Sequence, residues 1–174
     1  MASRATADAI DARLLSALAE DPRAATVTLA HRIGVSRNTV QARLARWDGS
    51  AVLASFERRV EPDFLGYPLR AFVLTNLKQR LLPEVSAALG KVPEVVEVHG
   101  LSGVADLLIQ VVARDVDDLY RVAGQILGIK GVKRTTTALV MRELVDYRLT
   151  PLIRRMTDDA GHAAVDSASS GVTH

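Results

Sequence analysis

The sequence predicts an α+β protein in which a winged helix-turn-helix precedes a ferredoxin-like βαββαβ domain. Three observations predict this class. Apolar residues at helical spacing dominate residues 1–60, with a glycine turn between two short helical patterns. Residues 61–68 contain two prolines and a glycine, which is typical of a hinge between domains. Residues 69–147 then alternate strand and helix patterns in the order βαββαβ.

The first predicted helix covers residues 8–19. Its apolar face consists of Ile10, Leu14 and Leu18, which recur at helical spacing. Acidic residues near its start favour the N-terminal end of a helix, because the helix dipole is positive there. Pro22 lies just beyond its end and stops it.

Residues 28–47, TLAHRIGVSRNTVQARLARW, predict two more short helices joined by a tight turn at Gly34. Ser36 stands where the N-cap of the second helix belongs. The buried face of that second helix is predicted to be Val40, Leu44 and Trp47.

The opposite face of this second helix carries amides, hydroxyls and guanidiniums, and no acidic residue before Asp48. Such a helix suits the DNA major groove, although a solvated surface would show the same residue types. Arginines here are expected to contact phosphates more than bases, and Arg37 alternatively packs at the edge of the buried stripe. The predicted DNA-binding residues are Ser36, Arg37, Asn38, Thr39, Gln41, Arg43, Arg46, Arg58 and Arg59.

The segment AVLASFERRV, residues 51–60, predicts a short two-stranded wing that turns near Ala54 and Ser55. Arg58 and Arg59 would then lie close to a phosphate backbone. The predicted domains are a DNA-binding domain, a hinge, a ligand-binding and dimerisation domain, and a partly disordered extension: residues 1–60, 61–68, 69–147 and 148–174.

Within residues 69–147, helices are predicted over 82–89 and 116–127. Residues 141–147 either continue the last strand or add a further one. A short helix over 150–156 precedes a small, polar end that is expected to be disordered. The predicted strands cover residues 69–77, 95–100, 105–113 and 132–140.

Composition narrows the function. The 174 residues include no cysteine, which excludes a disulfide framework and fits a reducing cytoplasm. The start of the chain lacks the apolar run of a signal peptide, and no apolar stretch is long enough to span a membrane. The net charge is only +2, but residues 1–60 hold nine Arg and six acidic residues, a basic excess that favours phosphate attraction.

No catalytic motif, cofactor site or metal site is expected. The chain shows no phosphate-binding loop, no nucleophile elbow and no paired histidine–carboxylate motif. Its four histidines are scattered without metal-ligand spacing. The sequence therefore favours a binding protein over an enzyme.

Five segments in order resemble the Lrp/AsnC family of transcription regulators, also called feast/famine proteins. They are IDARLLSALAEDPR, LAHRIGVSRNTVQARLARW, VEPDFLGYPLRAFV, VVEVHGLSGVADLLIQV and VKRTTTALVMREL, which together cover roughly residues 8–147. The resemblance implies a regulator that binds double-stranded DNA and a small-molecule effector, usually an amino acid. It also implies a homodimer that can assemble further into tetramers or octamers.

By resemblance, the effector pocket lies at a contact between dimers. The residue chemistry agrees, because a glycine turn exposes N–H groups that can hold a carboxylate and Asp106 could pair with an α-ammonium. Asp106 could equally cap the amides of its own turn, and the threonine run would suit any strand. The predicted effector-binding residues are His99, Ser102, Gly103, Val104, Ala105, Asp106, Thr135, Thr136 and Thr137.

The sequence departs from the family pattern at three positions. Val104 stands where the family often has an acidic residue, and Leu107 where it often has an aromatic one. Ala51 replaces the usual glycine before the wing. The first two departures keep open the alternative of an effector-independent architectural DNA-binding protein. A third hypothesis is a ligand-binding or enzymatic ferredoxin-like module whose N-terminal helices only contact proteins.

Overall fold

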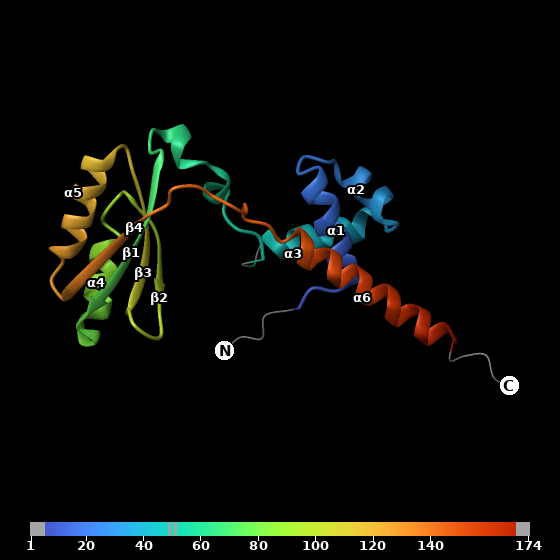
Figure 1. Cartoon of the computed structure of the whole chain (residues 1–174). Helices are drawn as coiled ribbons and strands as arrows, with labels where there is room; N and C mark the ends of the chain where they lie inside the picture. Colours follow the sequence, from blue (N-terminus) through green and yellow to red (C-terminus); the bar gives the residue numbers. More distant parts are fainter. Residues whose placement is uncertain (1–5, 49, 51, 170–174) are drawn as a thin grey trace. The chain divides into compact units, whose positions relative to one another are not determined.

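The computed structural model describes residues 6–48, 50 and 52–169. The chain forms two compact units (Figure 1). The terminal unit combines the two ends of the chain, Met1–Ala54 and Val145–His174, and the central unit comprises Ser55–Leu144. Each unit has a hydrophobic core of its own.

The terminal unit contains the three predicted N-terminal helices, α1 (Ala9–Glu20), α2 (Thr26–Ile33) and α3 (Arg37–Asp48). The side chain of Asp8 caps α1 by accepting from two backbone N–H groups. Gly34 ends α2 with φ of 69°, a left-handed conformation that favours glycine. The core between these helices consists of Leu14, Ala17, Leu29, Ala30, Ile33, Val40 and Trp47.

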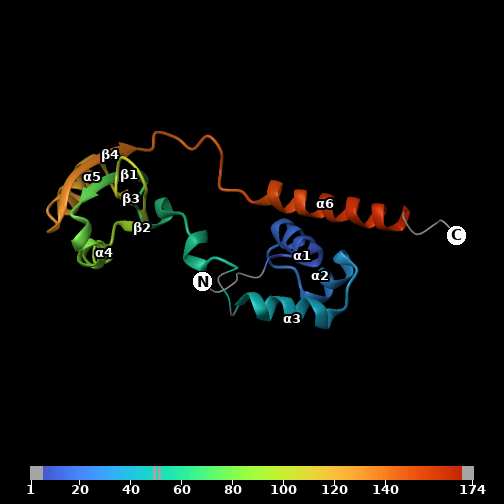
Figure 2. The same cartoon turned by 90° about the horizontal axis from the view of Figure 1, so that it is seen from below.

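A fourth helix of the terminal unit comes from the other end of the chain. Helix α6 (Thr150–Ser169) packs against α1. In Figure 2 it runs along the side of α1 that faces away from α3. The sequence predicted a helix only over 150–156, and α6 continues through much of the segment that was expected to be disordered.

The central unit has the predicted βαββαβ order. It consists of β1 (Leu69–Leu77), α4 (Leu82–Leu89), β2 (Val95–Gly100), β3 (Leu107–Ala113), α5 (Val116–Leu127) and β4 (Val132–Leu139). The strands form one antiparallel sheet in the order β2-β3-β1-β4. This confirms the ferredoxin-like expectation, with bounds that differ by two residues at the start of β3 and one at the end of β4.

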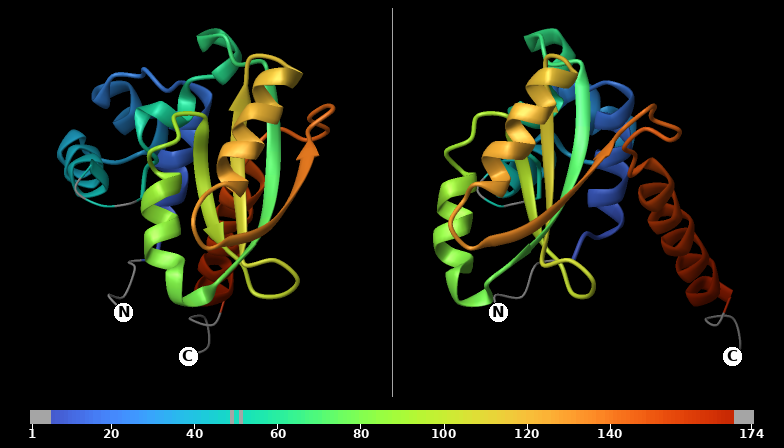
Figure 3. Two further views of the ribbon diagram at one scale, coloured as in Figure 1. Left: turned by 90° about the vertical axis from the view of Figure 1, so that its left-hand side faces the viewer. Right: turned by 60° about the vertical axis from the view of Figure 1, so that its left-hand side comes forward.

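Both helices of the central unit cover the same face of the sheet (Figure 3). Alternate residues of β1 and β3, such as Val73 and Ile109, point to that face and are fully buried against helix residues such as Val85 and Val122. The opposite face, which we call the open sheet face, carries the intervening residues. Of these, Phe72, Leu74 and Leu108 are half-buried.

An ionic cluster fixes the start of α5. Asp118 is buried and accepts hydrogen bonds from the side chains of Arg114 (Nε–Oδ2, 3.2 Å) and Arg121 (Nε–Oδ1, 2.9 Å). Arg121 also pairs with the buried Glu94. The hydrogen bonds from Arg114, followed by those from Arg121, hold the pKa of the Asp118 carboxyl well below its usual range.

Asp118→Asn is expected to lower the melting temperature of the protein by several degrees at pH 7. Because the pKa of Asp118 is lowered on folding, its stabilising effect is complete above the ordinary aspartate pKa and is lost as pH falls through the folded value. The difference between variant and wild type should therefore shrink below about pH 4. Melting curves across pH check this, with Asp117→Asn on the exposed side of the same turn as control. A difference that is constant with pH would contradict it.

Two local expectations were wrong. The described part of residues 51–60 holds no strand, and a 3₁₀ helix (Phe56–Arg59) takes the place of the predicted wing. An isolated two-stranded ribbon is marginal in water, whereas the Arg58 N–H finds a local partner in the carbonyl of Ser55 at 3.2 Å. Residues 141–147 form neither a continuation of β4 nor a further strand, and all of them are exposed.

No helix in the described part of the chain is long and apolar enough to cross a membrane.

Candidate nucleic-acid interface and ligand-binding domain

Helix α3 buries one stripe and exposes the other. Val40 and Trp47 are 0 % and 2 % exposed in the core of the terminal unit. On the other side, Asn38 and Gln41 are exposed, as is Arg37, so this arginine does not pack into the core. The described residues of α3 therefore present amide and guanidinium groups to solvent from a helix that is held rigidly by its buried stripe.

Ser36 caps the start of α3. Its Oγ accepts a hydrogen bond from the backbone N–H of Thr39 at 3.1 Å, and the two hydroxyls lie 2.8 Å apart. Both hydroxyl groups are therefore engaged within the first turn, as the N-cap prediction expected. Thr39 is half-buried, so the polar face begins with Arg37 and Asn38.

The two arginines later in α3 are held by α1. Arg43 lies 2.6 Å from Asp8 and 2.7 Å from Asp11, and only 17 % of its side chain is exposed. The hydrogen bond from Arg43 keeps the pKa of the Asp8 carboxyl below its usual value. Arg43 is thus a link between helices, and contact with DNA phosphate would require it to exchange these partners.

Arg46 is placed differently. Its Nη2 donates to both carboxylate oxygens of the buried Asp11, at 2.9 and 3.0 Å, while 53 % of its side chain is exposed. The guanidinium is oriented by Asp11 and still reaches solvent. Sequence reasoning treated Asp11 only as a favourable helix-start residue. Its partners lie about 35 positions away, and no local pattern shows such a contact.

Arg58 and Arg59 belong to the central unit, not to the helix-turn-helix. The side chain of Arg58 pairs with Glu97 of β2, and Arg59 is exposed. Without a wing to carry them, their contact with phosphate stays a prediction.

The loop between β2 and β3 is exposed and rests on the end of β1. Ser102, Gly103 and Val104 are exposed, and the Val104 side chain projects almost completely into solvent. Gly103 has φ of 127°, which favours glycine. The Nδ2 of Asn76 donates to the carbonyl of Val104 at 2.9 Å and holds the loop in place.

Asp106 is engaged by its own surroundings. Its Oδ2 accepts from the backbone N–H of Leu77 at 2.8 Å and its Oδ1 from Nε2 of Gln79 at 2.6 Å. Ala105 beside it is buried. Both carboxylate oxygens thus have partners at or just after the end of β1 and not the amides of the residue's own turn, which one of the two interpretations had expected. Contact of Asp106 with an effector stays a prediction.

The remaining predicted effector residues are distributed over both faces of the sheet. Thr136 pairs with Leu74 and so lies on the open sheet face, whereas Thr135 pairs with Thr75 on the helix-covered face. Thr136 and Thr137 are exposed. His99 is half-exposed in β2, with Nε2 3.4 Å from Glu97 Oε2.

The structure adds residues that sequence reasoning missed. Asn76 and Arg134 form a cross-strand pair beside the β2–β3 loop, and Arg134 is exposed. The loop, Asn76 and the start of β4 thus gather at one end of the sheet. Within the described residues no cluster of His, Asp or Glu has a metal-binding arrangement.

Comparison with known families matches the N-terminal helices and the sheet domain to two separate family models. The model of the AsnC-type helix-turn-helix domain matches residues 8–46, and that of the Lrp/AsnC ligand binding domain matches residues 70–150. The chain is also 32 % identical to a proline dehydrogenase transcriptional activator of Rhizobium radiobacter, over 79 % of this chain and 90 % of that protein.

The chain belongs to the Lrp/AsnC family. It is a transcriptional regulator with a DNA-binding helix-turn-helix and a ligand-binding domain. A similar relative is the HTH-type transcriptional regulator Rv2324 of Mycobacterium tuberculosis, 30 % identical over 83 % of this chain and 97 % of the relative.

Solved structures of Lrp/AsnC proteins share the fold. Escherichia coli AsnC superposes with a TM-score of 0.75 at 27 % identity, covering 84 % of this chain and all of that one. The feast or famine regulatory protein Rv3291c of M. tuberculosis, solved as a complex with L-methionine, gives a TM-score of 0.71 at 27 % identity, covering 82 % and 97 %. Most of α6 lies beyond both family models, since the match to the ligand binding domain ends at residue 150 and the match to the helix-turn-helix domain at residue 46.

Proposed function

We propose that this Lrp/AsnC regulator binds DNA sequence-specifically as a homodimer and that an amino acid modulates its activity. The observation that carries the proposal is the exposed polar face of α3, backed by a buried apolar stripe. A rigid helix with free amide and guanidinium groups fits the major groove, where bases present distinct donors and acceptors.

The roles on α3 follow from chemistry and exposure. Asn38 and Gln41 carry side-chain amides that can form bidentate hydrogen bonds with adenine, so they are assigned to base contacts. Arg46 is oriented by Asp11 but half-exposed, so it is assigned to phosphate. Ser36 positions the helix start and Arg43 fixes α3 against α1.

Dimerisation is assigned to the open sheet face. Phe72, Leu74 and Leu108 form an apolar strip across neighbouring strands of a face that no helix of the central unit covers. Burying such a strip against a second copy removes apolar surface from water. A twofold dimer would place two α3 helices about 34 Å apart, in successive major grooves of a pseudo-palindromic site.

The effector is assigned to the end of the sheet that gathers the β2–β3 loop, Asn76 and Arg134. The loop contains a glycine with exposed surroundings, and Arg134 offers a cation for a carboxylate. The similarity to a protein that was solved with L-methionine supports an amino acid as the chemical class. Asp106 would bind the ammonium only by giving up its bonds to Leu77 and Gln79.

An electrophoretic shift assay with DNA from upstream of the protein's own gene tests specific binding. A specific complex should survive an excess of unrelated DNA, whereas an architectural protein would be competed away. Absence of any shift at low salt would favour the third hypothesis, a module without DNA-binding activity.

Amino-acid binding is tested by thermal shift with the twenty amino acids. A ligand that binds the folded form should raise the melting temperature by an amount that grows with its concentration. Arg134→Ala should raise the ligand concentration needed for the same thermal shift about tenfold, because it removes the cation at that end of the sheet. Lys133→Ala, an exposed neighbour, is the control. A flat response to all twenty compounds would favour the effector-independent alternative.

A further inference from the structure

Helix α6 lies largely outside both family models, and its place in the structure points to a role of its own. We propose that α6, by docking on α1, makes the segment between β4 and α6 a second tether, that is, a second covalent link between the two units. The helix-turn-helix is then connected to the central unit both before β1 and after β4. The chain leaves the terminal unit after Ala54 and returns to it at Val145. The two units are therefore joined by two connections and not one.

The docking is seen in the burial of α1. The core face of α1 contains Ile10, Leu14 and Leu18. Ala12 lies on the opposite side, because successive residues of a helix are 100° apart, and yet it is 0 % exposed. Since α6 packs on α1 along the side away from α3, we infer that it covers Ala12. The small side chain lets the two helices approach closely.

Helix α6 shows a matching stripe. Its half-buried residues among 150–159 are Thr150, Ile153, Met156 and Thr157, which recur at helical spacing. Leu152, Arg154 and Arg155 lie on the outer side and are exposed. One face of α6 is therefore used for docking, as in an amphipathic helix on a globular domain.

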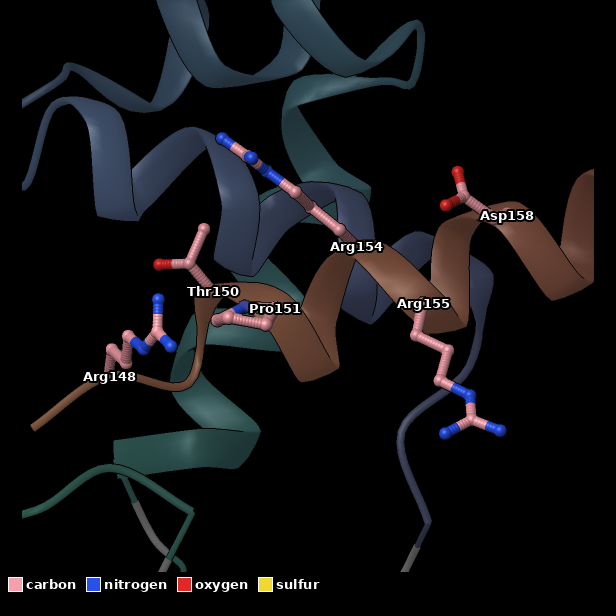
Figure 4. Close-up of a pocket in the computed structure, with 6 residues that line it drawn as sticks. All are labelled: Arg148, Thr150, Pro151, Arg154, Arg155 and Asp158. Atoms are coloured by element: carbon pink, nitrogen blue, oxygen red, sulfur yellow. The ribbon is translucent and has the colours of Figure 1, made fainter.

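Among the described residues at the start of α6, no group of side chains converges on a ligand position. A shallow depression of about 480 Å³ at its start is lined by Arg148, Thr150, Pro151, Arg154, Arg155 and Asp158. Figure 4 shows that the three guanidinium groups point in different directions and do not converge on one position. The function of α6 is thus assigned to its docked face.

The connector from β4 to α6 is short. Residues 140–149 separate the end of β4 from the start of α6, and even fully extended they span at most about 40 Å. Residues 141–149 are all exposed. With α6 docked, the terminal unit is linked to the central unit through two segments, the one after Ala54 and the one before α6. The second link limits the range of rotation of the terminal unit relative to the central unit.

The consequence for function, which rests on the proposed DNA binding by a dimer, is selectivity for half-site spacing. Two recognition helices on single flexible tethers would accept half-sites at several spacings. Doubly tethered helices would accept a narrow range, because each departure would strain one of the connections. Helix α6 would then determine which spacing between the two half-sites the dimer binds best.

The test uses one variant in two states. Residues 141–147 are replaced by a seven-residue recognition sequence for a site-specific protease, and the protein is compared before and after cutting. Cutting severs the second tether and leaves α6 docked. The melting temperature should change by less than about 2 °C, and α6 should co-elute with the rest of the chain. Release of the α6 fragment at micromolar protein would overturn the docking.

Two readouts then measure the restraint. On operators whose half-sites are moved apart by one to five base pairs, cutting should reduce discrimination between spacings about fivefold. Independently of DNA, spin labels at Arg23→Cys and Lys91→Cys report the distance between the units, since the natural chain has no cysteine. In dimers diluted with unlabelled protein, cutting should broaden this distance distribution about twofold.

An unchanged distance distribution after cutting would overturn the second tether, whatever the DNA result. Failure of the uncut protein to bind any operator would instead count against the proposed function and leave the distance measurement decisive. A substitution pair adds a check without cutting. Ile153→Asp on the docked stripe should broaden the distribution, whereas Leu152→Asp on the exposed side should not.

Discussion

Leu74→Asp is expected to convert the dimer to a monomer and to lower affinity for a paired half-site by at least about 100-fold. Leu74 lies in the middle of the open sheet face, beside Leu108 on one strand and Thr136 on the other. A carboxylate there must be taken out of water without a partner when two sheets meet. A monomer then binds one half-site and loses the gain from linked binding.

Sedimentation and a binding titration measure the two effects separately. Leu82→Asp is the matched control, because Leu82 is the exposed first residue of α4, where a negative charge is favourable. The control should remain dimeric and bind DNA as the wild type does. A dimeric Leu74→Asp protein would show that the open sheet face is not the subunit contact.

Gln41→Ala and Asn38→Ala are expected to relax the preference for one DNA sequence, each by about 1–3 kcal/mol at a single base pair. Both side chains are exposed and neither supports the core of the terminal unit. Loss of an amide should therefore leave the fold intact. Binding to a panel of operators with single base changes gives the discrimination at each position.

Arg46→Ala should behave differently from the two amide variants. It should weaken binding to all sequences alike and reduce the slope of log affinity against log salt by about 1. Arg43 would still partner Asp11 in this variant, so the carboxylate would not be left alone. Lys91→Ala, an exposed cation of the central unit, is the control for loss of charge. Unchanged base preferences in both amide variants would count against α3 as the reading element.

The local elements of this protein could be predicted from sequence because their signals are short-range. Helix α3 follows from the spacing of Val40 and Trp47 after the capping serine. The strands and helices of the central unit follow from the spacing of apolar residues, which changes between a strand pattern and a helix pattern from segment to segment. Glycine and proline residues mark where several of these segments end. The prediction of a wing was wrong because the local signal is weak there. The ten residues of that segment show no clear alternation of apolar and polar residues, and an isolated hairpin has no surface to pack against.

The sequence by itself determined the fold class, the polar face of α3 and the family resemblance, since the signals for each lie in neighbouring residues. Only the tertiary structure decided how Arg43 and Asp106 are used and where α6 goes. The Asp8 carboxylate that pairs with Arg43 lies 35 positions away. The donors that satisfy Asp106, the backbone N–H of Leu77 and the side-chain amide of Gln79, come from the end of another strand and the residues just after it. From sequence alone, most of α6 is indistinguishable from a disordered polar tail. The structure shows it as a helix packed on α1, because a helix of this composition is stabilised by packing and not by its own propensity.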